Sequence, residues 1–412
     1  MSVAQQPSDS ETRSSWPMAA AAGAFAVVMV GTTLPTPLYG LYRQAWGFSE
    51  LTVTVVFAVY ALGVMTVLTF LGDLSDVVGR RRATLLGLSL AAVSSAIFLA
   101  ADGLPMLMAG RLCSGFSAGL FTGAATAYVL ELAPPGAHDR AAFVATAANM
   151  GGLGLGPVLG GLLAQYAPWP LRLPYLVHLL LTLAATAVTW RLPETVTEAK
   201  PWRASHVRFP ALPRSVRARF VPAGLAGFVG FSLLGLFTSV TPEFLSHGLG
   251  VTNLAAIGGV VLTAFAGSTA GQFLAVRFSP ERTLPLGCFL LLIGFGLVAV
   301  TLTWRSLTVL LLAALVGGAG QGFVLRSSVA QLSSQAGAAK GQVLSAFFLV
   351  AYAGISLPVV GVGLLASALG LPTAGRILAA VMGALSLIVG LHLRTPARAG
   401  ASPEASDRAG AD

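Results

Sequence analysis

The sequence Gly72-Asp-Leu-Ser-Asp-Val-Val-Gly-Arg-Arg-Arg82 is a short polar segment between two long apolar ones. The apolar stretches 51–71 and 83–101 lie directly before and after it. Only 9% of the 412 residues are charged, yet this segment holds two aspartates and three arginines. Its glycines, at positions 72 and 79, permit tight turns and close approach of neighbouring helices. The segment therefore predicts a tight polar connection between two apolar helices.

The composition indicates an integral membrane protein. Hydrophobic residues make up 55% of the chain, and the mean hydropathy is +0.81. Soluble domains are about 45–50% apolar and about 25% charged, so this chain has too few charges to cover a soluble surface. Cys113 and Cys288 lie within apolar stretches and are interpreted as small buried hydrophobic residues, not as a disulfide or a metal site.

Twelve stretches are long enough to span a bilayer, which needs about 20 apolar residues each. Stretches of this length differ from the short alternating segments of a barrel, so the predicted fold class is an all-α integral membrane protein. The twelve transmembrane helices are predicted to form two six-helix bundles. The spans are 17–42, 50–71, 83–101, 105–132, 141–166 and 172–191, then 221–246, 253–276, 284–303, 307–334, 342–368 and 371–393.

The longest interior break, rich in proline and basic residues, divides the chain into two halves. Pro157-Val-Leu-Gly-Gly in the fifth span and Pro358-Val-Val-Gly-Val in the eleventh indicate a weak parallel repeat. Such a repeat is typical of transporters in which one half rocks against the other around a midplane site. The predicted parts are a tail at 1–16, a bundle at 17–192, a linker at 193–220, a second bundle at 221–394 and a disordered tail at 395–412.

The basic residues indicate the orientation of the chain. Most fall in the loops on the side of the two termini, whereas only Arg43, Arg172 and Arg305 fall clearly on the other side. By the positive-inside rule, both termini are expected in the cytoplasm of a multi-pass protein of the inner (plasma) membrane. The same placement favours the lipid bilayer over nucleic acid as the partner of the net charge of +9. Residues 1–15 lack the basic and apolar regions of a signal peptide.

The spacing Gly-x-Leu-Ser-Asp-x-x-Gly-Arg-Arg-Arg resembles the loop between the second and third helices of major facilitator superfamily transporters. The overall motif pattern is most similar to their proton-coupled drug efflux branch. The resemblance implies that this loop latches the two halves together in the outward-open state. In this chain Val77 stands where the family usually has a basic residue. The predicted latch residues are Gly72, Asp76, Gly79, Arg80, Glu131 and Arg140.

The residue types suggest how such a latch would be held. Asp76, at the end of the second span, could accept from the N-terminal amides of a neighbouring helix or pair with an arginine. Glu131, at the end of the fourth span, is expected to pair with Arg80 or Arg140 rather than to bind substrate.

Arg111 and Glu243 are the candidates for proton coupling. An arginine at the midplane costs about 2.5–3.5 kcal/mol, so Arg111 is either an anchor that reaches toward the outer interface or a functional residue. Its Arg-x-x-x-Gly spacing resembles a fourth-span motif of proton-coupled transporters, in which the arginine is associated with proton movement. Glu243 is either a titrating carboxylate near the outer end of the seventh span or an ordinary residue in contact with water.

The fifth span contains a glycine-rich string with one proline. Its Gly-x-x-x-Gly spacing and proline predict close packing and a kink. The string also resembles the fifth-span motif of the antiporter branch, although Phe143 replaces the glycine with which that motif usually begins. The partial resemblance favours export over uptake. The residues of the string are Gly152, Gly156, Pro157, Gly160 and Gly161.

Few other polar side chains occur in the spans. His178 is interpreted as a packing residue with satisfied hydrogen bonds. The candidates for lining a substrate cavity are Tyr39, Tyr60, Asn149, Gln321 and Arg326.

The sequence predicts a monomeric secondary transporter that exports small hydrophobic or cationic compounds in exchange for protons. It holds no P-loop string and no arrangement of nucleophile and base, so neither an ATP-driven pump nor an enzyme is expected, and no cofactor besides the coupling proton. The scarcity of acidic residues within the spans argues against cations as substrates. One alternative is a proton symporter that imports a sugar or another metabolite. The other is a non-transporting membrane receptor or assembly factor of the same fold.

Overall fold

The computed structural model describes residues 15–196 and 212–394. The predicted tails at 1–16 and 395–412 lie outside the described residues, except for residues 15 and 16, and so does most of the predicted linker. In the described part, twelve helical segments are long and apolar enough to cross a membrane, and no strand occurs. The predicted all-α fold class is therefore confirmed.

The first six spans use the helices before residue 197. The first span is broken into α1 (Trp16–Thr33), the single turn η1 (Thr36–Leu38) and α2 (Tyr39–Trp46). The short helix α4 (Leu74–Val78) lies in the connection between the second and third spans. The remaining spans are α3 (Glu50–Phe70), α5 (Arg80–Ala100), α6 (Leu104–Glu131), α7 (His138–Tyr166) and α8 (Leu173–Trp190).

The last six spans follow the same order. The seventh is a continuous run of α9 (Arg214–Gly235), η3 (Leu236–Val240), α10 (Thr241–Glu243) and η4 (Phe244–Gly248). The turn η5 (Gly337–Ala339) connects the tenth and eleventh spans. The other spans are α11 (Leu254–Ala275), α12 (Pro280–Trp304), α13 (Leu307–Ala336), α14 (Lys340–Leu369) and α15 (Leu371–Arg394).

Three features of the helices reflect proline chemistry. Helix α9 begins at Arg214, inside the predicted linker 193–220, directly after Pro213. In the seventh span Pro242 cannot donate a backbone hydrogen bond, and wider π-helical turns lie on both sides of α10. Pro35 and Pro37 similarly accompany the break between α1 and α2. The first and seventh spans are therefore irregular at their proline residues.

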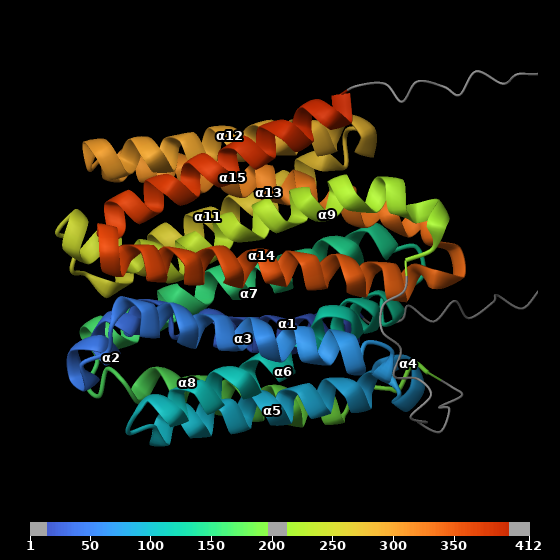
Figure 1. Cartoon of the computed structure of the whole chain (residues 1–412). Helices are drawn as coiled ribbons and strands as arrows, with labels where there is room; N and C mark the ends of the chain where they lie inside the picture. The colour runs from blue at the N-terminus through green and yellow to red at the C-terminus, as the bar shows by residue number, and fades with distance from the viewer. Residues whose placement is uncertain (1–14, 197–211, 395–412) are drawn as a thin grey trace, which may run out of the picture.

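The spans run side by side in two groups, with α9 and α11–α15 on one side and α1, α3, α5, α6 and α8 on the other (Figure 1). We call the end that carries Gly72–Arg82 the motif end and the end that carries Arg43 the opposite end. In Figure 1 the motif end lies on the right, with α4, and the opposite end on the left, with α2.

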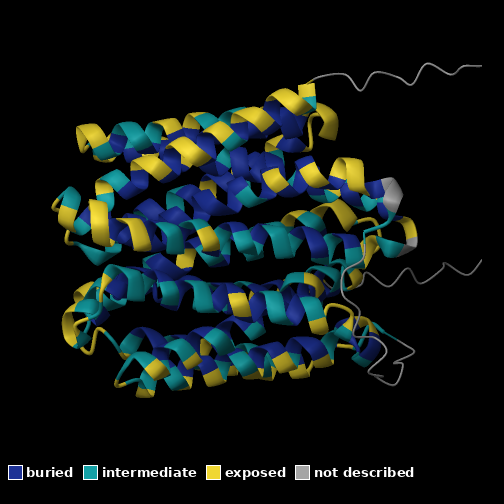
Figure 2. Ribbon diagram, in the orientation of Figure 1, coloured by how far each residue is buried: buried dark blue, intermediate teal, exposed yellow. Residues whose placement is uncertain are grey.

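The outward faces of the helices are apolar, as lipid contact requires. Exposed residues, yellow in Figure 2, lie along the outside of the bundle. The exposed large hydrophobic residues include Leu62, Leu180 and Ile388. Exposed tryptophans mark the helix ends, with Trp190 at the motif end and Trp304 at the opposite end. Tryptophan at both ends of apolar spans is typical of the two membrane interfaces.

Helix α7 packs closely against α1 through the predicted glycine face. A Cβ atom at Gly152 would lie 2.6 Å from the carbonyl oxygen of Ala26 in α1. A Cβ atom at Gly156 or Gly160 would overlap backbone atoms of the first span as well. Small residues let backbones approach to this distance and gain van der Waals contact. Gly152, Gly156 and Gly160 therefore lie at a close contact between α7 and the first span.

The same helix also forms a seam with α11 of the second half. A Cβ at Gly161 would overlap the carbonyl oxygen of Leu254, and one at Gly258 would overlap that of Pro157. The seam is closed at the opposite end by Gln165, which accepts from the Leu254 amide over 2.9 Å. It is closed at the motif end by Phe143, whose ring stacks on Phe273 with centroids 4.3 Å apart.

Helices α3 and α14 form the second seam. Near the opposite end, Gly363 leaves room for the Thr54 side chain. In the middle, the rings of Tyr60 and Tyr352 meet edge to face at 6.4 Å. A Cβ at Gly72, at the motif end, would lie 3.2 Å from the Ser345 hydroxyl oxygen. Both seams are therefore in contact near both ends of the bundle.

The two glycines Gly161 and Gly151 of α7 offer a direct test of the seam. A Cβ at Gly151 meets no atom within 4 Å, whereas one at Gly161 overlaps backbone. We expect Gly161→Ala to cost about 1–3 kcal/mol of stability, as overpacking does, and to push α7 and α11 apart at the opposite end. Gly151→Ala should leave the protein unchanged.

Thermal unfolding in detergent micelles measures the stability difference. Spin labels at Ala167 and Thr252, in a background with Cys113 and Cys288 replaced, report the separation of the two helices. Identical distance distributions for the two variants would show that Gly161 does not set this contact.

Candidate functional site

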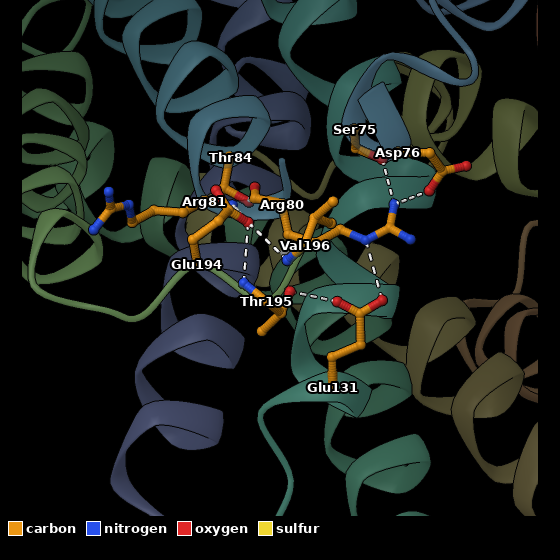
Figure 3. A network of polar contacts seen from close by, with 9 residues as sticks. All are labelled: Ser75, Asp76, Arg80, Arg81, Thr84, Glu131, Glu194, Thr195 and Val196. Atoms are coloured by element: carbon orange, nitrogen blue, oxygen red, sulfur yellow. Dashed lines mark hydrogen bonds and ion pairs between the residues drawn. The ribbon is translucent and has the colours of Figure 1, made fainter. Parts of the chain in front are cut away.

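Arg80 connects three elements at the motif end. Its Nη1 donates to the Ser75 hydroxyl over 2.6 Å and pairs with the Asp76 carboxylate, while its Nε donates to Glu131 Oε1 over 3.2 Å (Figure 3). Ser75 and Asp76 belong to α4, and Glu131 ends α6. A guanidinium holds several acceptors in a fixed geometry, so Arg80 joins α4, α5 and α6.

Glu131 extends this network to the segment that follows the sixth span. Its second oxygen accepts a short hydrogen bond from the Thr195 hydroxyl. The Tyr128 hydroxyl, one turn earlier on α6, donates to the Pro193 carbonyl over 2.7 Å. The first residues after α8 are therefore held against α6.

Glu194 caps the N-terminus of α5. Its Oε1 accepts from the Arg81 amide over 3.3 Å and from the amides of Thr195 and Val196 over 3.1 and 3.4 Å. The free amides and the dipole at a helix N-terminus favour a carboxylate at this place. Arg81 also donates from its Nη1 to the Leu192 carbonyl over 3.1 Å. Glu194 thus ties the connection after α8 to the start of α5.

Gly79 is required for this cap. Its φ of +104° lies in the region that favours glycine, and a Cβ there would overlap the Glu194 carboxylate. Gly79 occupies the N-cap position of α5 without a side chain of its own, so the cap must come from elsewhere in the chain. Sequence reasoning missed Glu194, although an acidic residue after a span and a helix that begins at glycine were both visible.

Asp73, not Asp76, is the aspartate next to the second half. A Cβ at Gly341, in the first turn of α14, would lie 3.4 Å from Asp73 Oδ1. A negative charge beside a helix N-terminus is favourable. Of the two partners predicted for Asp76, the structure shows the arginine, Arg80, and the side chain of Asp76 remains 59% exposed. The loop reaches α14 through its second residue because α4 turns Asp76 back toward α5.

Arg140 does not pair with Glu131 in this conformation. Arg140 is exposed in the first turn of α7, and Glu131 is instead engaged by Arg80 and Thr195. The choice between Arg80 and Arg140 as the partner of Glu131 is therefore decided in favour of Arg80. Arg80 approaches because α4 and α5 bring it over the end of α6.

At the opposite end, Glu243 joins the two halves. Arg43 Nη1 lies 2.6 Å from Glu243 Oε1 and 3.6 Å from Glu50 Oε1. His247 Nδ1 lies 2.9 Å from the same oxygen of Glu243. The Glu243 side chain is 16% exposed and is paired, so it is held between the two halves.

Arg111 is buried in the first half. It is 1% exposed, and its Nη1 donates over 2.7 Å to the carbonyl of Thr32, one of the last residues of α1. Its guanidinium lies 4.7 Å from the Tyr60 ring centroid and 5.6 Å from that of Phe57. The interpretation as an interfacial anchor is wrong, because a carbonyl at the broken end of α1 and two aromatic faces hold the cation inside.

The cavity candidates have different surroundings in this conformation. Tyr39 is buried in the hydrophobic core, and Tyr60 lies on the α3–α14 seam. Gln321 accepts from the Ser268 hydroxyl. Asn149 and Arg326 are half-buried. Among the described residues, no cluster of histidine, cysteine and carboxylate side chains could hold a metal ion.

His178 is a buried residue with both ring nitrogens in hydrogen bonds. Its Nδ1 lies 2.7 Å from the Ser95 hydroxyl and its Nε2 2.9 Å from the Val27 carbonyl oxygen. It holds α8 against α5 and α1, in agreement with its interpretation as a packing residue.

Replacement of Glu194 tests the cap on α5. We expect Glu194→Ala to lower stability by about 1 kcal/mol and to speed hydrogen exchange of the amides at the start of α5. Glu194→Gln should lose only part of this, since its amide oxygen can still accept while the charge is gone. Asp102→Ala, at an exposed loop residue, is the matched control. Equal exchange rates in all three variants would rule out capping by Glu194.

Comparison with known proteins gives the family. The model of the Major Facilitator Superfamily matches residues 21–359. The quinolone resistance protein NorA of Staphylococcus aureus is 27% identical over 152 residues, which are 36% of this chain and 38% of NorA. The MFS efflux transporter aclA of Aspergillus oryzae is 35% identical over 112 residues, 27% of this chain and 20% of aclA. The matches thus span well under half the length of these relatives.

Solved structures share the fold at low identity. A crystal structure of the peptide transporter POT superimposes with a TM-score of 0.75 and 14% identity, covering 94% of this chain and 95% of that one. The nucleoside transporter NupG gives a TM-score of 0.67 with 12% identity, covering 92% and 98%. With its twelve spans and a family match over most of its length, this chain is a multi-pass membrane transporter of the major facilitator superfamily.

Proposed function

We propose that this transporter exports small, largely hydrophobic compounds by proton-driven antiport, with the motif end on the cytoplasmic side. The basic residues of the loops support this orientation through the positive-inside rule. The fifth-span string and the two relatives named for resistance or efflux support export. The observation that carries the proton coupling is the ion pair between Arg43 and Glu243.

The pair joins the two halves at the end that faces outward in this orientation. Arg43 belongs to α2 of the first span and Glu243 to α10 of the seventh. Protonation of Glu243 removes the charge that holds Arg43, so it favours the conformation that is open on this side. Loss of the proton restores the ion pair between Arg43 and Glu243 and closes this side of the transporter. The protonation state of Glu243 thereby changes the balance between the states of alternating access; for antiport, a proton taken up from outside must leave on the cytoplasmic side.

At the motif end, closure depends on different contacts. Asp73 beside the first turn of α14 and Gly72 beside Ser345 join the loop to the second half. The Arg80 network holds that loop on α5 and α6. Because the two ends use separate contacts, one end can open while the other stays closed.

Replacement of Glu243 tests the proton coupling. We expect Glu243→Gln, which resembles the protonated side chain, to shift the balance toward the outward-open state by about 1 kcal/mol, or about fivefold. Transport should then become insensitive to external pH. Glu281→Gln, at an exposed carboxylate in the first turn of α12, is the matched control.

Flux into proteoliposomes at several external pH values measures the pH dependence, and spin labels across the opposite end measure the opening. If Glu243→Gln keeps the pH dependence of the wild type, Glu243 is not the coupling group. In pump-deficient cells, the protein should lower accumulation of a toxic hydrophobic compound, and an uncoupler should restore it. Increased accumulation would instead indicate the importing symporter.

A further inference from the structure

The charges inside the bundle are unbalanced. Among the described residues, Arg111 is the one aspartate, glutamate, lysine or arginine that is buried. All described acidic residues lie at or near an end of the bundle, and Glu243 among them is already paired with Arg43. These acidic residues are Glu50, Asp73, Asp76, Asp102, Glu131, Asp139, Glu194, Glu243 and Glu281.

Arg111 is also incompletely satisfied. Its described partners are the Thr32 carbonyl and the faces of Tyr60 and Phe57, and its Nε has no hydrogen-bond partner. A guanidinium in apolar surroundings is costly unless an anion or enough acceptors surround it. A carboxylate is the partner that best fits its planar set of donors.

Arg111 lies one aromatic ring away from the seam between the halves. Its guanidinium packs on Tyr60, and Tyr60 meets Tyr352 of α14 across that seam. Tyr352 in turn meets Phe231 of α9 with ring centroids 5.7 Å apart. Separation of α3 from α14 would therefore uncover an aromatic surface with a cation directly behind Tyr60.

A second unsatisfied donor lies in the other half. Gln321 is 1% exposed, and its Nε2 has no partner while its oxygen accepts from Ser268. Ser268 also contacts the Met150 sulfur of α7 over 3.6 Å, which places this group near the α7–α11 seam. Both unsatisfied nitrogen atoms are donors, so each would be satisfied by an acceptor on a ligand.

We propose that the compound carried by this transporter is a small aromatic or apolar anion, such as a carboxylate, and that Arg111 is the cation that binds it. This proposal rests on the transport function proposed above and replaces the cationic compounds expected from the sequence. A cationic compound would meet Arg111 in the interior, without a described carboxylate to offset the repulsion.

Three probes with one ring system and different charges test the proposal. They are 2-naphthylacetate, 2-(2-naphthyl)ethanol and (2-naphthylmethyl)trimethylammonium. Binding is measured by isothermal titration calorimetry on the whole protein in phosphatidylcholine nanodiscs without a proton gradient. We expect the wild type to bind the acetate at least about tenfold more tightly than the ammonium compound, because hydrogen bonds between charged groups are stronger than those between neutral groups.

Variants then assign the preference to Arg111. Arg111→Gln should weaken acetate binding about tenfold and leave the binding of the alcohol unchanged, while Arg111→Lys should keep the preference for the acetate. Arg172→Gln, which removes a charge at the opposite end, is the matched control. Size-exclusion profiles and binding of the alcohol show that each variant is folded.

Two outcomes would overturn the proposal. One is the absence of any preference for the acetate in the wild type, and the other is an equal loss of all three probes in Arg111→Gln. The assay is independent of the proposed proton coupling. A preference for the acetate together with transport that ignores an uncoupler would refute proton-driven export and leave the role of Arg111 intact.

Discussion

A charged side chain is costly in an apolar interior, and this cost determines where charged residues lie in the described chain. The acidic residues lie at the ends of the spans, where they hold the loop after α3, cap α5 and join the first span to the seventh. Arg111 is the exception in the interior, and it is held by a carbonyl left free at the end of α1. The two ends are thus fastened by ions and the middle by aromatic and small side chains.

Glycine makes the interior compatible with movement. At Gly161 and Gly258 the two halves meet backbone to backbone, without long side chains that interlock. Such contacts gain van der Waals energy at close range and lose it over a small separation. Opening of either end therefore requires the loss of a few specific contacts, such as Arg43 with Glu243 or Asp73 with α14, rather than the repacking of a core.

The spans could be predicted from the sequence because length and hydropathy alone determine them. The Arg80 network could be predicted in part, since Glu131 and Arg80 are charged residues at neighbouring helix ends. Glu194 was missed because its partners are backbone amides, and Asp73 because it lies beside the first turn of a distant helix; neither arrangement leaves a trace in side-chain spacing. Arg140 does not pair with Glu131 although the two are close in sequence, because proximity in sequence says nothing about the direction in which α7 leaves the loop. Burial of Arg111 depends on the break after α1, and sequence proximity to an interface suggested the opposite.

The first span connects the two places where charge matters most. Its part α2 carries Arg43, which pairs with Glu243, and its part α1 carries the Thr32 carbonyl, which accepts from Arg111. The break at Pro35 and Pro37 lies between them, where the lost backbone bonds let the two parts change their angle. Release of Arg43 would free α2 and could shift the end of α1, so that Arg111 loses or regains a carbonyl partner. In that case, a proton at Glu243 would change the affinity of Arg111 for an anion without any direct contact between the two sites.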